Sequence, residues 1–367
     1  MRKLAVVSIL VGLVMPLPAT SGAAPPFQGE GKLELLTWEG YTQRTWVVPF
    51  ERSTHCSVSA AYARSPDDMA RAMRDRGRFD LVSAGGDIAR RLIGERLVRA
   101  VDVRRVPPSA HFFEALRAPS FTTVAGVRYG IATLWGPNVL LYNAAKVTPA
   151  PRSWSAVYDE RYRGRIAVPD NPLQIADAAL YLGATKPALR IRDPYRLTGA
   201  QLAAAVALLK RQRGLVASYW RYASDEVGLF EDGRAWLGSG WRWQSDRLAD
   251  HKIEVRTLVP REGVTGWADS WMLSAQAQHP RCAYAWLRWI SQPAVQAELA
   301  VDFGAAPANR LACGYMDEIE RGSCATAHAN APPSFLRSIR FWQTPGAGCS
   351  ACAGEDAWRR AWAEVRR

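Results

Sequence analysis

Residues 129–142, YGIATLWGPNVLLY, form a strand-like apolar run with one interruption, at Trp135-Gly136-Pro137. Tyr129–Leu134 predicts one strand, and strand character resumes over Val139–Tyr142. Because glycine and proline break strands, we expect the chain to leave one sheet here and to enter another. A crossing of this kind indicates two lobes joined by a strand hinge.

Strands and helices alternate on both sides of this segment, which predicts the α/β class. We expect a second crossing near Gly266, so that two lobes enclose a cleft, where small ligands commonly bind. The first lobe should contain residues 29–134 and 266–312, and the second should contain residues 135–265 and 313–367. The predicted strands are Leu33–Trp38, Phe79–Ser83, Arg165–Pro169, Ala235–Ser239, Ile253–Val259 and Trp267–Leu273, and the predicted helices are Asp67–Arg76, Asp87–Arg96, Trp154–Tyr158, Leu173–Leu182, Ala200–Gln212, Cys282–Ile290 and Ala294–Phe303.

The N-terminus has the three parts of a secretory signal peptide. Arg2 and Lys3 supply positive charge, and Leu4–Met15 is apolar. Ser21 and Ala23 occupy the −3 and −1 positions of a cleavage site. This apolar run is too short to span a bilayer, no cysteine at the cut offers a lipid anchor, and no later stretch is long enough for a transmembrane helix. We expect Met1–Ala23 to direct export to the periplasm; the alternative is a buried N-terminal helix.

The length of the chain and the distribution of its charges limit the kinds of function it can have. A chain of 367 residues suggests two domains, and 48% hydrophobic residues suffice for a sizeable core. The formal net charge is +13, but the basic residues are scattered among acids and their densest runs are pairs such as Arg359-Arg360. Such residues are typical of a solvated surface, so we do not expect nucleic-acid binding. The 15 Trp exceed what packing usually demands, and indole faces also serve ligands.

Six cysteines follow the predicted cleavage site: Cys56, Cys282, Cys313, Cys324, Cys349 and Cys352. An even number in an oxidising compartment predicts disulfides, although sequence does not choose among all the pairings. Cys313 and Cys324 are the favoured local pair. The Cys349-Ser-Ala-Cys352 spacing indicates a structural disulfide, with a redox or zinc site as the alternative.

The sharpest constellation of candidate ligand-binding groups is Thr265-Gly266-Trp267-Ala268-Asp269-Ser270. Residues two apart on a strand share a face, so Trp267 and Asp269 should present an indole and a carboxylate to the same space. This pair suits an ammonium group: a cation–π contact contributes about 0.5–2 kcal/mol, and a hydrogen bond to a charged group contributes about 1.5–3 kcal/mol. The alternative is a core tryptophan beside an aspartate paired at the surface.

Two other strand ends repeat this combination. Trp38-Glu39-Gly40-Tyr41 follows the first strand, and Leu237-Gly238-Ser239-Gly240-Trp241 places another tryptophan beside glycines. Each segment alone has a structural explanation. Together with the predicted cleft, three tryptophans at strand ends favour a binding site.

Catalytic motifs are largely missing from the sequence. It lacks GxSxG, HExxH, a P-loop and GxGxxG, and its five histidines are dispersed. We therefore expect no enzyme, no cofactor and no metal site. The alternative of another class is an enzyme, which would need a histidine near Ser83 or Ser239.

The chain resembles the periplasmic solute-binding proteins of ABC importers for spermidine and putrescine, and within them a polyamine-binding subgroup. The resemblance runs over almost the whole mature chain. The segments that carry it are Trp38–Tyr41, Phe79–Asp87, Tyr129–Asn143, Ser153-Trp154, Gly164–Asp170, Glu262–Asp269, His279–Tyr284 and Phe341–Pro345. The resemblance implies the type II periplasmic binding fold, with hinge-linked lobes around a ligand cleft. One member of the subgroup is linked to polyhydroxybutyrate synthesis, which keeps a hydrolase or synthase-like enzyme as the alternative.

The resemblance also implies roles for individual residues. Trp38, Trp241 and Trp267 match stacking tryptophans, and Asp269 matches the amine-binding aspartate. The chain departs from the family's pattern elsewhere: Asn171 and Gln174 stand where an Asp and a Glu are expected, Asp87 replaces a Tyr, and Glu39-Gly40 replaces Thr-Glu. The candidate ligand-binding residues are Trp38, Glu39, Tyr41, Ser83, Asp87, Trp135, Asn171, Gln174, Trp241, Trp267 and Asp269.

The number of carboxylates should follow the charge of the ligand, because an unpaired buried ammonium is costly. The departures therefore favour putrescine or another small amine over spermidine. An ω-amino acid or another amino acid is the alternative, with Arg128 or Arg242 meeting its carboxylate. The expected partners are the amine and an inner-membrane ABC permease, and the protein is expected to be a monomer.

Overall fold

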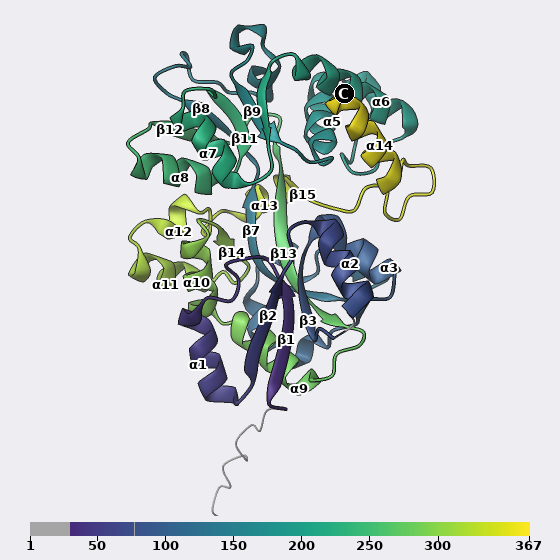
Figure 1. The fold of residues 1–367 in the computed structure, drawn as a ribbon, viewed down its shortest axis with the longest axis vertical. Helices are drawn as coiled ribbons and strands as arrows, with labels where there is room; N and C mark the ends of the chain where they lie inside the picture. The colour runs from purple at the N-terminus through teal and green to yellow at the C-terminus, as the bar shows by residue number, and fades with distance from the viewer. Residues whose placement is uncertain (1–29, 77) are drawn as a thin grey trace, which may run out of the picture.

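The computed structural model describes residues 30–76 and 78–367, which form two β-sheets with helices around them (Figure 1). The predicted signal peptide Met1–Ala23 lies outside the described residues. An eight-stranded sheet forms the first lobe and a five-stranded sheet forms the second. Strands and helices alternate along both, which confirms the α/β class. None of the helices in the described ranges is long and apolar enough to cross a membrane.

The eight-stranded sheet has the order β14-β7-β13-β3-β1-β2, with β4 and β15 also paired to β13. Its central strands are apolar runs that are buried on both faces; β3, for example, is buried at all five positions. The strands are β1 (Lys32–Thr37), β2 (Ser57–Tyr62), β3 (Leu81–Gly85), β4 (Val98–Arg99), β7 (Gly130–Pro137), β13 (Val264–Ser274), β14 (Ala306–Pro307) and β15 (Ile339–Phe341), and a separate hairpin contains β5 (Thr123–Val124) and β6 (Val127–Arg128).

The five-stranded sheet has the order β10-β9-β11-β8-β12. Parallel β10 and β9 alternate with helices, whereas β8 and β12 run antiparallel to each other. Its strands are β8 (Val139–Asn143), β9 (Ile166–Pro169), β10 (Val216–Trp220), β11 (Leu237–Gly240) and β12 (Val255–Leu258).

Helices pack around both sheets, and their ends follow local sequence signals. Thr198 and Gln201 form a capping box at the start of α6, and Pro280 occupies the first turn of α9. The helices are α1 (Arg44–Thr54), α2 (Pro66–Arg76), α3 (Gly86–Gly94), α4 (Glu114–Arg117), α5 (Gln174–Thr185), α6 (Gly199–Arg213), α7 (Ala223–Glu231), α8 (Arg242–Asp250), α9 (Pro280–Ile290), α10 (Pro293–Asp302), α11 (Ala312–Ile319), α12 (Ser323–Thr326), α13 (Pro333–Ser338) and α14 (Glu355–Arg366).

The chain crosses between the sheets at the segment that opened the sequence argument. β7 belongs to the first sheet and β8 to the second, and only Asn138 separates them. The predicted end of the strand at Leu134 is wrong, because β7 continues to Pro137 and pairs with β13 up to Gly266. Gly136 permits this pairing, since a Cβ there would lie 3.1 Å from the Trp267 ring. The return crossing lies between β12 and β13, close to Gly266 as expected.

The C-terminal segment differs from the predicted division at residue 313. β15 pairs with β13 in the first sheet, and α11 lies beside α10 of the first lobe (Figure 1). The chain then passes to the second lobe, where α14 packs with α5 and α6. The chain therefore passes from the first lobe to the second for the last time after β15, and the predicted division at residue 313 is too early. The sequence shows where a strand lies but not which strand it pairs with.

Three disulfides join the six cysteines. Cys313–Cys324 closes the α11–α12 hairpin, and this predicted pair is confirmed. Cys349 and Cys352 are bonded to each other, and Cys56–Cys282 joins the start of β2 to α9. The described residues hold no cluster of three or more His, Cys, Asp or Glu that could bind a metal.

Candidate ligand-binding site between the lobes

A cavity of about 660 Å³ lies between the two lobes, and both contribute to its wall. The first lobe supplies residues after β1, at the start of α3 and in β13. The second lobe supplies residues after β9 and β11 and at the start of α5. The ends of strands thus carry the lining, which is where α/β folds place ligand-contacting groups.

Nine of the eleven candidate residues line this cavity: Trp38, Glu39, Tyr41, Asp87, Asn171, Gln174, Trp241, Trp267 and Asp269. They come from five separate stretches of the sequence, and the fold brings these distant stretches together around one cavity. Whether each of them contacts a ligand stays a prediction.

Ser83 and Trp135 are not part of the cavity wall. Ser83 is completely buried inside β3, where it pairs with Trp271 of β13. Trp135 is also completely buried, its indole N–H donates to the Pro307 carbonyl over 3.0 Å, and its ring meets Phe113 and Phe341 edge-on. The structure corrects both assignments, because these side chains point into the core of the first lobe.

Asp269 is the buried acid at the first-lobe end of the cavity. The Tyr41 hydroxyl donates to its Oδ2 over 2.5 Å. Asp87 lies close by on α3: a Cβ on Gly85 would lie 2.6 Å from Asp87 Oδ1 and 3.3 Å from Asp269 Oδ1. Two carboxylates therefore converge on Gly85, which stands opposite Asp269 in the β3–β13 ladder.

Neither carboxylate has a cation beside it in the part of the chain that the structure describes, where no ion pair includes Asp87 or Asp269. Burial raises the pKa of Asp269 to about 7; the Tyr41 hydrogen bond opposes this rise and the charge of Asp87 adds to it. Burial likewise raises the pKa of Asp87 to about 6. Both groups would be stabilised as carboxylates by a positive charge placed between them.

Asp177 is a cavity acid that the sequence analysis missed. It lies in the first turn of α5 in the second lobe, where Gln174 Nε2 donates to its Oδ2 over 2.8 Å and the Thr265 hydroxyl donates to its Oδ1. Burial raises its pKa to about 6. Its spacing of three residues from Gln174 on a helix was the available signal, because residues three apart share a face.

Hydrogen bonds continue from Asp177 across the hinge to the aromatic wall. Asn138 Nδ2 donates to the Thr265 hydroxyl over 2.6 Å, and the Trp241 indole N–H donates to Asn138 Oδ1 over 2.9 Å. The chain of contacts fixes the orientation of Trp241 relative to Asp177. A carboxylate offers about four acceptor positions and Asp177 uses two of them here, so it retains capacity for a ligand N–H.

The charged side chains that line the cavity give it an excess of acids over bases. Asp170 is neutralised by Arg366 at 3.1 Å and Arg221 at 3.5 Å, and Arg242 is held by Asp246 at 3.0 Å. Two further acids, Glu39 and Asp302, are exposed at its edge. The cavity arginines Arg221 and Arg242 are therefore paired with acids. Among the described residues, no ion pair includes Asp87, Asp177 or Asp269.

Aromatic side chains cover much of the remaining wall. Trp241 meets Trp220 edge-on with ring centroids 5.5 Å apart, and Trp342 lies on its other side with centroids 6.5 Å apart. Trp38, Trp243, Trp267 and Phe303 also line the cavity. Sequence reasoning missed Trp220, Trp243 and Trp342, because only the lobe arrangement brings them to this space. Flat rings beside acids form a site suited to an ammonium group on an alkyl chain.

Comparison with known proteins agrees with this geometry. Residues 45–312 match the family model described as bacterial extracellular solute-binding protein. A putrescine/cadaverine-binding protein of Pseudomonas aeruginosa is 22% identical over 86% of this chain and 87% of its own length. The spermidine/putrescine-binding periplasmic protein of Escherichia coli K12 is 21% identical over 74% of this chain and 76% of its own.

Solved structures share the fold. The spermidine/putrescine ABC transporter substrate-binding protein PotD of Streptococcus pneumoniae superposes with a TM-score of 0.74 at 16% identity, over 91% of this chain and 97% of that one. This confirms the expected two-lobed periplasmic binding fold. Since the family model covers most of the sequence, the chain belongs to the bacterial extracellular solute-binding proteins and is not an enzyme.

Proposed function

We propose that this protein is the solute-binding component of an ABC importer and that its ligand is a small diamine of the putrescine type. The observation that carries the proposal is the carboxylate pair Asp87 and Asp269 in an aromatic cavity, where neither acid has an ion-pair partner among the described residues. Desolvated charges of one sign are costly, and an ammonium group between them removes that cost. The names of the relatives from P. aeruginosa and E. coli support the same ligand class.

The position of Asp177 favours two ammonium groups over one. Asp177 belongs to the second lobe and is hydrogen-bonded to Thr265, whereas Asp269 lies four residues further along β13. Four residues of strand span about 13 Å between Cα atoms, so Asp177 and Asp269 offer acids at two separate positions along the cavity. Each ammonium group of a diamine would thus pair with one acid, the first with Asp269 and the second with Asp177.

An ω-amino acid fits this cavity less well. Its carboxylate would need a free arginine, but Arg242 is held by Asp246 and also donates to the Thr326 carbonyl over 2.7 Å. Arg221 already faces Asp170, and Arg128 lies outside the cavity wall. The charge balance therefore favours a ligand without an anionic end.

Calorimetric titration with putrescine, n-butylamine and γ-aminobutyrate tests the proposal. We expect putrescine to bind at least tenfold more tightly than either monoamine, because only a diamine reaches both acids. Asp177→Asn should weaken putrescine binding about tenfold or more and leave n-butylamine nearly unchanged, since the removed charge serves only the second ammonium. If Asp177→Asn weakened the binding of putrescine and n-butylamine equally, Asp177 would not be the partner of the second ammonium group. Failure of all three ligands to bind would overturn the proposal.

Location and assembly complete the proposal. Cleavage after Ala23 would release the mature chain into the periplasm, where it would act as a monomer and deliver the amine to an inner-membrane permease. The disulfides are compatible with an oxidising compartment.

A further inference from the structure

The C-terminal helix α14 is anchored in the second lobe. Trp358, Trp362 and Val365 are buried in the same apolar cluster as α5 and α6. The Trp362 indole N–H donates to Asp170 Oδ1 over 3.1 Å, and Lys210 of α6 pairs with Glu364 at 3.0 Å. We therefore treat α14 as a part of the second lobe that follows any motion of that lobe.

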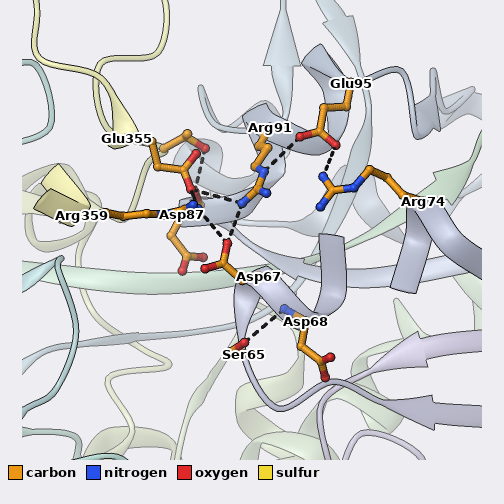
Figure 2. A network of polar contacts seen from close by, with 10 residues as sticks. Ser65, Asp67, Asp68, Arg74, Asp87, Arg91, Glu95, Glu355 and Arg359 are labelled. Carbon is orange, nitrogen blue, oxygen red and sulfur yellow. Dashed lines mark hydrogen bonds and ion pairs between the residues drawn. The ribbon is translucent and has the colours of Figure 1, made fainter. Parts of the chain in front are cut away.

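The first turns of α14 reach across to the first lobe. Arg359 pairs with Asp67 of α2 at 2.7 Å, and Glu355 pairs with Arg91 of α3 at 3.3 Å. Arg91 also pairs with Asp67 at 2.6 Å, and Arg359 also contacts Glu355. Figure 2 shows these four side chains converging between α14 and the α2–α3 pair.

The first-lobe half of this network is held in place independently of α14. Arg91 pairs with Glu95 at 3.0 Å, and Glu95 pairs with Arg74 of α2 at 2.6 Å. These contacts lie within α2 and α3 and would survive separation of the lobes. Within this network, opening of the cavity would therefore break only the pairs that Asp67 and Arg91 form with Arg359 and Glu355.

The network also borders the candidate ligand site. Asp87 lies beside it in Figure 2, and the charges of Glu355 and Asp67 add to burial in raising the pKa of Asp87. The linker before α14 makes a second contact, because the Thr344 hydroxyl donates to the Asp87 carbonyl over 2.7 Å. A cation bound at the Asp87 carboxylate would offset the repulsion between this carboxylate and those of Asp67 and Glu355.

We propose that α14 is an electrostatic latch between the lobes, closed by the pairs Arg359–Asp67 and Arg91–Glu355, and that a cation bound at Asp87 tightens it. The tightening rests on the proposed amine site, whereas the latch itself does not. By linkage, a ligand that strengthens the latch also binds more tightly when the latch is intact. We expect this gain in affinity to appear mainly as slower release of the ligand.

The expected effect is moderate. Exposed ion pairs contribute little singly, but here several charges share one network and Arg91 is mostly buried. We expect the latch to change the closed population and the rate of ligand release about three- to tenfold. Salt should reduce this effect, because exposed charges are screened.

The test compares Arg359→Ala with Arg360→Ala, which removes the same side chain from the next, exposed position of α14. Fluorophores placed through noncanonical residues at exposed Arg52 of α1 and Ala188 of the second lobe report lobe separation by energy transfer. Putrescine release is followed by stopped-flow tryptophan fluorescence, and both measurements use the whole protein at about 20 and 500 mM NaCl.

In low salt, we expect Arg359→Ala to lower the closed fraction of the free protein and to speed putrescine release, each about three- to tenfold relative to Arg360→Ala. The difference between the two variants should be smaller in high salt. Indistinguishable variants in low salt would overturn the latch. If putrescine fails to bind, the energy-transfer measurement on the free protein still decides the latch, so the proposed ligand and the latch fail separately.

Discussion

At the scale of single residues, Asp269 should contribute most to amine binding. Asp269→Asn keeps the size of the side chain and an acceptor for the Tyr41 hydroxyl but removes the charge. We expect putrescine affinity to fall by about 30-fold or more, equivalent to about 2 kcal/mol, because a buried charge-assisted contact is lost. Calorimetric titration at pH 8, where the carboxylate is ionised, measures this loss.

The matched control is Asp302→Asn, at the exposed edge of the same cavity. Water screens this acid, so its removal should change the affinity less than threefold. Similar losses in the two variants would mean that the cavity attracts cations only by its overall charge, without a specific contact at Asp269.

At the residue level, the sequence predicted which side chains line the cavity where chemistry and strand position coincided; ligand contact by these residues stays a prediction. Trp267 and Asp269 lie two apart on β13 and both reach the cavity, as their spacing on a strand suggested. Ser83 and Trp135 failed because polarity or an indole ring does not reveal which face of a central strand opens to a cleft. Asp177 was missed because its significance comes from Thr265, a partner 88 positions away in the sequence.

At the scale of elements, the close crossing of the linker over α3 depends on Gly86. A Cβ on Gly86 would lie 2.0 Å from the Trp342 carbonyl oxygen, so Gly86→Ala must displace the linker or the helix. We expect a loss of about 1–3 kcal/mol in the free energy of unfolding, as for other overpacked sites. Because Trp342 lines the cavity, putrescine affinity should also fall.

Gly94→Ala is the control at the other end of α3, where an added Cβ meets nothing within 4 Å. Alanine favours a helix over glycine by about 0.5–1 kcal/mol, so this variant should be as stable as the parent or slightly more stable. Urea denaturation of both variants measures their free energies of unfolding and tests this difference. A Gly86→Ala protein as stable as Gly94→Ala would show that the linker adjusts without cost.

Periodicity located most of the elements that border the cavity, including β9, α5, β11 and β13, to within a few residues. It did not locate α14, although Trp358, Trp362 and Val365 follow a helical spacing. The spacing of apolar residues also does not show which surface of the protein a helix will pack against. The assignment of 313–367 to one lobe failed because β15 and α14 pack on different lobes, a fact fixed by tertiary partners alone.

At the scale of the whole molecule, the cavity acids couple proton binding to stability. The pKa of Asp269 is raised from 3.8 to about 7, and those of Asp87 and Asp177 are raised to about 6. Between about pH 4 and 7 the folded protein therefore holds more protons than the unfolded chain. The contribution of these groups to stability falls as the pH rises through that window. Urea denaturation of the free protein should show the fall, and Asp269→Asn should lessen it.

Amine binding should follow the opposite trend, because a cation requires the carboxylates in their charged form. Putrescine affinity should increase from pH 5 to 8, and binding near pH 6.5 should release protons into the buffer. Titrations in buffers of different ionisation enthalpy measure that release directly. An affinity independent of pH over this range, with no proton release, would mean that Asp269 and Asp87 are already ionised in the free protein. The cavity would then have to hold water or a solution cation that stabilises the two charges, and the ligand would bind by displacing it.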